Sequence, residues 1–185
     1  NCDGNSVMRD IMRDKESKFK ILFMKQMSHH LQDLDDEFLQ KVDNIFLIRD
    51  PKEVIPSLTI QLPDAKVSDT GLDIQWKLYQ SLISMGGNPV IIDSRELLIN
   101  PEFILTKLCA HLKINYSKGM LSWNPGPINE DGIWSKYWYE TVHKSSTFMP
   151  YKPKPDLQKK FLPLYNKCLP YYNNLYKHAL VAKRS

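Results

Sequence analysis

One stretch of the sequence, residues 44–58 (NIFLIRDPKEVIPSL), constrains the fold more than any other. Residues 45–48 form an uninterrupted apolar run of strand length, which is typical of a parallel strand buried on both faces. Arg49 comes next. Asp50 and Pro51 then provide a helix-capping residue and the residue best tolerated at the first helical position. The stretch therefore predicts a strand, a tight turn and a helix, with Arg49 at the carboxyl end of the strand.

This predicted junction has the features of a phosphate-binding site. In open α/β sheets, ligands bind at the carboxyl ends of strands, and a helix N-terminus offers free N–H groups to an anion. Arg49 adds a planar guanidinium suited to bidentate contact with phosphate, and Ser57 adds a hydroxyl donor. The alternative, on the residues alone, is that Arg49 pairs with a nearby carboxylate and Ser57 faces its own helix.

Strand and helix signals alternate along the rest of the chain. Short apolar runs at residues 21–24 and 89–93 predict two further buried strands. A capping box at residues 70–73 and the glycine pair 86–87 predict the start and end of one helix, and Asn100 followed by proline predicts the start of another. This alternation is typical of an α/β fold with a parallel sheet.

Composition indicates an ordinary globular protein. With 185 residues, 42% of them hydrophobic and 25% charged, the chain can form one domain with a substantial core. A net charge of +4 is far short of a nucleic-acid-binding signature. The three cysteines form neither a disulfide framework nor a metal-ligand pair. We expect no signal peptide within these residues, leave targeting signals upstream of Asn1 open, and find no apolar run near the roughly 20 residues of a membrane span. We predict a cytoplasmic location, no nucleic-acid partner and no metal.

We expect a single domain with three parts. Residues 1–18 are polar and poorly defined, residues 19–148 contain the nucleotide-binding α/β core, and residues 149–185 form a C-terminal helical segment. The last part is expected to contain one or two helices, broken at Pro163 and Pro170.

The string IRDPKEVIPSL resembles the 3′-phosphate-binding segment of PAPS-dependent sulfotransferases. Two further strings, EDGIWSKYWYETVHKSSTF and CLPYYNNLYKHAL, are similar to a bacterial, plant and invertebrate branch of that family. The resemblance covers nearly the full chain from Phe19 onward. It implies a P-loop nucleoside-kinase-like fold, a three-layer parallel sheet flanked by helices, with Arg49 and Ser57 holding the 3′-phosphate. The co-substrate it implies is PAPS, and the product is 3′-phosphoadenosine 5′-phosphate.

The resemblance also implies a set of catalytic residues. The string KQMSHHL is similar to a family arrangement in which a strand ends in a Lys that is followed closely by a catalytic His. Lys25 would then stabilise the sulfuryl group, and His29 or His30 would remove the proton of the acceptor. Imidazole, with a reference pKa of about 6.5, suits that task near neutrality. Cytosolic members place the His two residues after the Lys, whereas here the first is four residues after, so the choice between His29 and His30 stays open.

A second matching element lies later in the chain. The string DGIWSK looks like a divergent form of the family's Gly-Trp-Lys element, which folds over the nucleotide, and this implies that Trp134 and Lys136 bind the cofactor. The family's preceding Arg-Lys-Gly run is missing, and Lys136, His143 or Lys144 could substitute for it. The alternative is that the aromatic residues here only cover the core.

One landmark of the family is missing from this sequence. Among the seven glycines, none lies in a loop that could cradle the 5′-phosphosulfate, and Gly4 is the only one before Lys25. We therefore predict that the domain is incomplete at its N-terminus, with its first strand and loop upstream of Asn1. The predicted strands at residues 21–24 and 45–48 would then lack the neighbour between them.

The function predicted from the sequence is transfer of a sulfuryl group from PAPS to a hydroxyl or amine, on a small-molecule or glycan acceptor. The sequence indicates neither the acceptor nor the oligomeric state, and whether the chain is active without the missing loop stays open. The first alternative is a non-catalytic sulfotransferase-like interaction domain. A second, less favoured, is a P-loop nucleotide kinase with Asp93 as its Mg²⁺ ligand.

Overall fold

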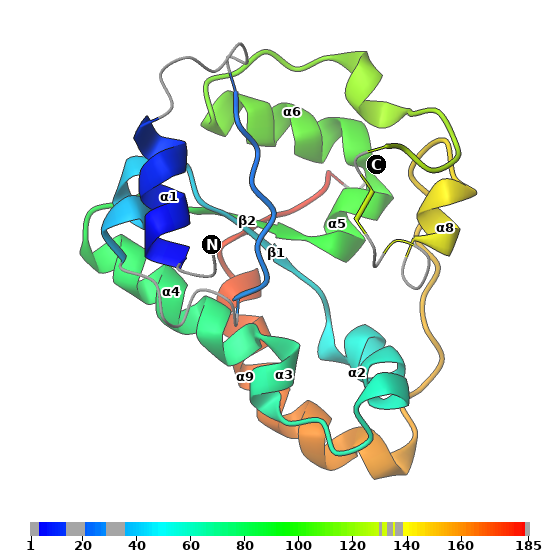
Figure 1. Ribbon diagram of the computed structural model, residues 1–185. Helices are drawn as coiled ribbons and strands as arrows, with labels where there is room; N and C mark the ends of the chain where they lie inside the picture. The colour runs from blue at the N-terminus through cyan, green and yellow to red at the C-terminus, as the bar shows by residue number, and fades with distance from the viewer. Residues whose placement is uncertain are drawn as a thin grey trace.

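The computed structural model describes residues 4–13, 21–28, 36–129, 131–132, 135 and 139–183. It is a mixed α/β fold built on a small parallel sheet (Figure 1). The strands are β1 (Ile45–Ile48), β2 (Val90–Asp93) and β3 (Ala179–Leu180). Their order is β1-β2-β3, and both pairs are parallel, with Ile48 beside Asp93 and Ile91 beside Ala179.

Helices connect and cover these strands. The α-helices are α1 (Gly4–Arg13), α2 (Pro51–Gln61), α3 (Val67–Thr70), α4 (Leu72–Ser84), α5 (Ser94–Ile99), α6 (Pro101–His111), α8 (Glu140–His143) and α9 (Leu162–Tyr176). Short 3₁₀ helices are η2 (Asp36–Lys41), η3 (Lys118–Leu121) and η4 (Lys159–Phe161). Within the described ranges, no helix is long and apolar enough to cross a membrane.

Hydrophobic clusters lie on both faces of the sheet, but the prediction that β1 is buried on both faces is wrong, because Leu47 is 59% exposed. On one face, Phe46, Ile48 and Ile91 pack with residues of α4 and α9. On the other, Ile92 packs with Ile104 of α6 and with Ala182. Neighbouring residues of a strand point to opposite faces, so Ile91 and Ile92 belong to different clusters. Figure 1 shows α4 and α9 on one side of the sheet and α6 on the other.

The predicted junction between the first central strand and its helix is confirmed. β1 ends at Ile48, and α2 begins at Pro51. The side chain of Asp50 caps the helix by accepting a hydrogen bond from the backbone N–H of Lys52 at 2.8 Å. Helix α2 continues through Pro56 to Gln61. The predicted strand at 89–93 and the predicted helix start at Asn100 are confirmed as well.

The prediction of a buried strand at residues 21–24 is wrong. Residues 21–27 form no regular structure, and the side chains of Ile21, Leu22 and Phe23 are 61%, 60% and 77% exposed. An apolar run becomes a strand only where another strand offers it hydrogen bonds. In the described part of the chain, β2 is the one strand that pairs with β1, and no strand pairs with residues 21–24. The upstream strand and the wider P-loop-like sheet stay predictions.

The predicted capping box at residues 70–73 is also replaced by another arrangement. Helix α3 ends at Thr70, and Gly71 adopts a left-handed conformation (φ 72°) before α4 begins at Leu72. A side chain at Gly71 would be strained by that φ, and its Cβ would clash with the hydroxyl of Ser28. The end of α4 at Ser84, before the glycine pair, agrees with the prediction.

The C-terminal helix is longer than predicted. Helix α9 runs without a break across Pro170, although a proline removes one internal hydrogen bond. Cys168, Tyr172 and Leu175 are buried in the main cluster, and this packing outweighs the local cost. The chain then forms β3, which is too short for an apolar run to reveal it in the sequence.

We expect Leu175→Ala to destabilise the fold. Leu175 is fully buried between α9 and the sheet, so the substitution leaves a cavity and lowers the free energy of unfolding by about 2–5 kcal/mol. Urea denaturation followed by circular dichroism measures the effect. Leu162→Ala, the same change at a position 40% exposed at the start of α9, is the control and should cost far less. Equal losses in the two variants would contradict this account of the core.

Candidate functional site

The candidate site lies at the carboxyl edge of the sheet. The register pairs Ile48 of β1 with Asp93 of β2, so the residues that follow both strands emerge at the same edge. Arg49 follows β1, and Arg95 lies two residues after the end of β2. This is the edge at which open α/β sheets bind ligands.

Arg49 is held by a carboxylate but keeps part of its guanidinium open. Its Nε donates a hydrogen bond to Oε2 of Glu53 at 3.0 Å. The Glu53 side chain is 7% exposed, whereas that of Arg49 is 45% exposed. No described residue accepts a hydrogen bond from the two terminal nitrogens of Arg49. Those nitrogens are the pair that can bind two oxygens of one phosphate.

Ser57 is exposed on α2, one turn after Glu53, but its hydroxyl already has a partner. Its Oγ donates to the backbone carbonyl of Val54 at 2.9 Å, the local bond that helical serines often make. Both interactions that the sequence analysis gave as the alternative to phosphate binding are therefore present. The arginine pairs with a carboxylate, and the serine bonds to its own helix. To contact a phosphate, Ser57 would have to exchange its bond to Val54.

The N-terminus of α2 does not offer the free N–H groups that were expected. Asp50 takes up all three of the first available groups. Its side chain accepts from Lys52 N, and its backbone carbonyl accepts from Glu53 N at 2.8 Å and Val54 N at 3.2 Å. Pro51 has no N–H. An anion at this edge would therefore depend on side chains, Arg49 first among them.

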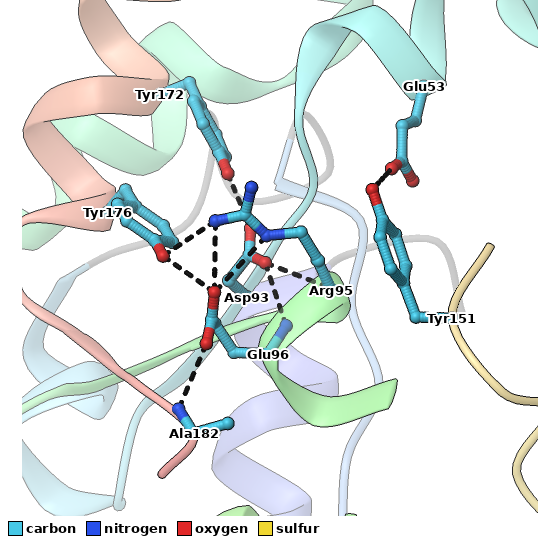
Figure 2. A network of polar contacts seen from close by, with 8 residues as sticks. All are labelled: Glu53, Asp93, Arg95, Glu96, Tyr151, Tyr172, Tyr176 and Ala182. Atoms are coloured by element: carbon cyan, nitrogen blue, oxygen red, sulfur yellow. Dashed lines mark hydrogen bonds and ion pairs between the residues drawn. The ribbon is translucent and has the colours of Figure 1, made fainter. Parts of the chain in front are cut away.

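Glu53 has a second partner that the sequence analysis missed. The hydroxyl of Tyr151 donates to Oε1 of Glu53 at 2.9 Å (Figure 2). Burial raises the pKa of Tyr151, and the bond to Glu53 raises it further. Glu53 could have been found from its position four residues after Arg49. Tyr151 could not, because 98 residues separate it from Glu53.

The end of β2 carries a buried carboxylate, Asp93. Its Oδ1 accepts from the backbone N–H groups of Arg95 (2.9 Å) and Glu96 (3.2 Å), and its Oδ2 accepts from the hydroxyl of Tyr172 at 2.9 Å. Burial raises the pKa of Asp93, and these hydrogen bonds partly offset the effect. A fully buried, fully bonded carboxylate cannot act as an open Mg²⁺ ligand, so the kinase alternative loses its candidate residue. Among the described residues, no cluster of three or more His, Cys, Asp or Glu side chains is placed to hold a metal ion.

Glu96 forms the centre of a second set of bonds (Figure 2). Its Oε1 accepts from Arg95 Nη2 at 3.0 Å and from the hydroxyl of Tyr176 at 2.7 Å, and its Oε2 accepts from Ala182 N at 3.0 Å. Burial alone would raise the pKa of Glu96, but the three donors lower it below its ordinary value. The carboxylate thereby joins α5 to α9 and to the segment after β3.

The other predicted site residues are not brought together with Arg49 by any described contact. Lys25 is exposed in the irregular segment 21–27. His29, His30, Trp134 and Lys136 lie outside the described residues, so their roles stay predictions.

Two of the three residues proposed as substitutes for the missing basic run, His143 and Lys144, have acidic partners, and the third, Lys136, lies outside the described residues. His143 Nε2 lies 2.8 Å from Asp131 Oδ2, and Lys144 Nζ lies 2.6 Å from Glu140 Oε1. A hydrogen bond from the backbone N–H of Ile128, together with His143, lowers the pKa of Asp131. Both basic residues are thus engaged locally.

One of the comparisons with known proteins shows the family of this chain. The model of the family described as "Sulfotransferase domain" matches residues 6–179. The chain therefore belongs to the sulfotransferase domain family. It is similar to two proteins of Arabidopsis thaliana, named branched-chain-amino-acid aminotransferase-like protein 2 (37% identical over 179 residues, 96% of this chain) and protein 1 (36% over 174 residues, 89% of this chain). It spans 32% and 31% of their lengths. No solved structure matches the chain significantly.

We expect Glu96→Gln to destabilise the fold in a pH-dependent manner. Gln keeps the size of the side chain but leaves Arg95 without its buried anion, which should cost about 3 kcal/mol near pH 7. Because folding lowers the pKa of Glu96 below its ordinary 4.5, its contribution is complete above pH 4.5 and disappears as pH falls through the folded value. Urea denaturation of both proteins between pH 3 and pH 7 measures the difference.

The difference between wild type and Glu96→Gln should shrink below pH 4.5. Glu102→Gln, on the exposed start of α6, is the control and should change stability little at any pH. An equal loss at pH 3 and pH 7 would show that the Glu96 carboxylate does not contribute in its charged form.

Proposed function

We propose that this chain is part of a PAPS-dependent sulfotransferase that transfers a sulfuryl group to a hydroxyl or amine. Membership of the sulfotransferase family supports the reaction class. The observation that carries the nucleotide assignment is Arg49 at the end of β1, with its Nε held by Glu53 and its terminal nitrogens not bonded to any described residue. This geometry suits a terminal phosphate such as the 3′-phosphate of PAPS.

In the proposed reaction, the acceptor oxygen or nitrogen forms a bond to sulfur while the bond between sulfur and the 5′-phosphate oxygen breaks. The leaving phosphate keeps the electron pair, which gives 3′-phosphoadenosine 5′-phosphate. His29 or His30 takes the acceptor's proton, and Lys25 offsets negative charge near the sulfuryl group. Catalysis then rests on positioning and electrostatic stabilisation.

The rest of the proposal concerns the contacts to the nucleotide, the acceptor and the location of the protein. Arg49 and Ser57 bind the 3′-phosphate, with Ser57 exchanging its bond to Val54, and Trp134 and Lys136 cover the nucleotide. The acceptor is a small molecule or a glycan, and the protein works in the cytoplasm. The curated relatives are about three times as long as this chain, so these roles are proposed for the longer protein to which such a domain belongs.

We expect the purified chain to bind 3′-phosphoadenosine 5′-phosphate saturably in a calorimetric titration. Arg49→Ala should weaken that binding at least about 10-fold, because it removes a charge-assisted bidentate contact. Lys77→Ala is the matched control. It also removes one positive charge, but from an exposed position on α4, and it should leave binding unchanged. Both variants should remain folded by circular dichroism.

A folded wild-type chain that does not bind would contradict the nucleotide site in this chain. It would favour a non-catalytic relative, unless a version of the protein extended at the N-terminus restores binding. Equal weakening in Arg49→Ala and Lys77→Ala would instead indicate non-specific attraction of the nucleotide to positive charge.

A further inference from the structure

Tyr151 lies far from Arg49 in the sequence but is linked to it through one shared carboxylate. Its hydroxyl donates to Oε1 of Glu53 at 2.9 Å, while Arg49 Nε donates to Oε2 at 3.0 Å (Figure 2 shows the Tyr151–Glu53 contact). Tyr151 belongs to the segment that leads from α8 toward α9, and Glu53 to the first turn of α2. The carboxylate therefore has one donor on each oxygen.

Glu53 depends on both donors because its side chain is 7% exposed. A carboxylate removed from water is costly unless each of its oxygens finds a partner. Arg49 supplies the opposite charge, and Tyr151 supplies the second hydrogen bond on a rigid ring with only two side-chain torsions. Burial raises the pKa of Tyr151, so its hydroxyl keeps its proton and stays a donor through the physiological range.

The way the two Glu53 oxygens are shared between Tyr151 and Arg49 determines which guanidinium nitrogens remain available to a ligand. With Oε1 occupied by Tyr151, Glu53 meets the guanidinium with Oε2, on the Nε side. Without the tyrosine hydroxyl, Oε1 would lose its one donor among the described residues, and the guanidinium already bonded to Oε2 could supply another. The carboxylate could then bind Arg49 in a fork that engages a terminal nitrogen as well as Nε. That arrangement would occupy a nitrogen that a phosphate needs.

A second contact joins the same two segments but has little strength. Lys52 Nζ lies 3.0 Å from Oδ1 of Asp156, and the Asp156 side chain is fully exposed. Exposed ion pairs of this kind contribute little. The hydrogen bond between Tyr151 and Glu53 is thus better buried than this ion pair between the segment before α9 and the start of α2.

We propose that Tyr151, acting through Glu53, is a positioning residue for Arg49, and that its hydroxyl keeps both terminal nitrogens of the guanidinium available to an anionic ligand. This inference rests on the proposed function, since it takes the ligand of Arg49 to be the nucleotide phosphate. It adds a residue that the family resemblance did not indicate.

The test is a calorimetric titration with 3′-phosphoadenosine 5′-phosphate on six proteins: wild type, Arg49→Ala, Tyr151→Phe, Tyr171→Phe, Arg49→Lys and the double variant Arg49→Lys/Tyr151→Phe. Tyr151→Phe keeps the ring and removes the hydroxyl. It should weaken nucleotide binding about 5- to 10-fold. A hydrogen bond to a charged group is worth more than this, but here only part of its loss reaches the ligand, through Glu53 and Arg49. Tyr171→Phe, a half-buried tyrosine of α9, removes the same atom and should leave affinity unchanged.

The double variant distinguishes positioning from a general structural effect. Lysine at position 49 keeps the charge but has a single side-chain nitrogen. It has no pair of terminal nitrogens that Tyr151 could keep available to the ligand. Tyr151→Phe should then change affinity less than twofold in the Arg49→Lys background. An equal loss in both backgrounds would overturn the inference, because Tyr151 would be acting independently of Arg49.

The outcomes also separate this inference from the proposed function. If the wild type binds, Arg49→Ala loses binding and Tyr151→Phe binds like the wild type, the proposed function stands and the inference is wrong. If the folded wild type does not bind at all, the proposed function of this chain fails, and the inference fails with it. A 15N-edited spectrum of the Arg49 guanidinium adds a readout without ligand. In Tyr151→Phe the fork should engage a terminal nitrogen and slow exchange of its N–H signals, and terminal N–H signals that are the same in Tyr151→Phe and the wild type would count against positioning.

Discussion

The interaction on which this structure depends most is the burial of two carboxylates at the end of β2. Neither Asp93 nor Glu96 reaches water, so each must find its donors within the protein. The donors come from distant parts of the chain: the first turn of α5, two tyrosines one helical turn apart on α9, and the backbone just after β3. Together these bonds hold α9 and the segment after β3 against the end of β2. These bonds fix the edge of the sheet at which Arg49 emerges.

The sequence predicts well those features that nearby residues determine. The β1–α2 junction follows from an apolar run, a capping aspartate and a proline within a few positions, and the structure contains all three as expected. Features that depend on distant partners were missed or wrong. Residues 21–24 have the composition of a strand but no described strand beside them, β3 is defined only by its pairing with β2, and α9 crosses Pro170 because its buried face is well packed.

At the candidate site too, the sequence predicts what nearby residues determine and misses contacts between distant residues. Arg49 could be placed at the strand end from the sequence, because its position depends only on where β1 stops. Asp50 was recognised as a cap, but a cap that bonds to the first N–H groups leaves none of them for a ligand. The sequence interpretation assigned the same N–H groups both to the cap and to an anion. The bond from Tyr151 joins residues 98 positions apart, and no periodicity or motif indicates it. The chemistry at this edge therefore rests on tertiary contacts that a family motif does not describe.

The outer side of β1 has a consequence for how the sheet can grow. In the described part of the chain no strand pairs there, and the carbonyl of Leu47 instead accepts a bond from the side-chain amide of Gln75 at 3.3 Å. An edge of this kind is a template for an added strand. Such a strand would have to displace the Gln75 amide of α4. Because both hydrophobic clusters lie on the faces of the sheet, widening the sheet along β1 would leave their packing intact.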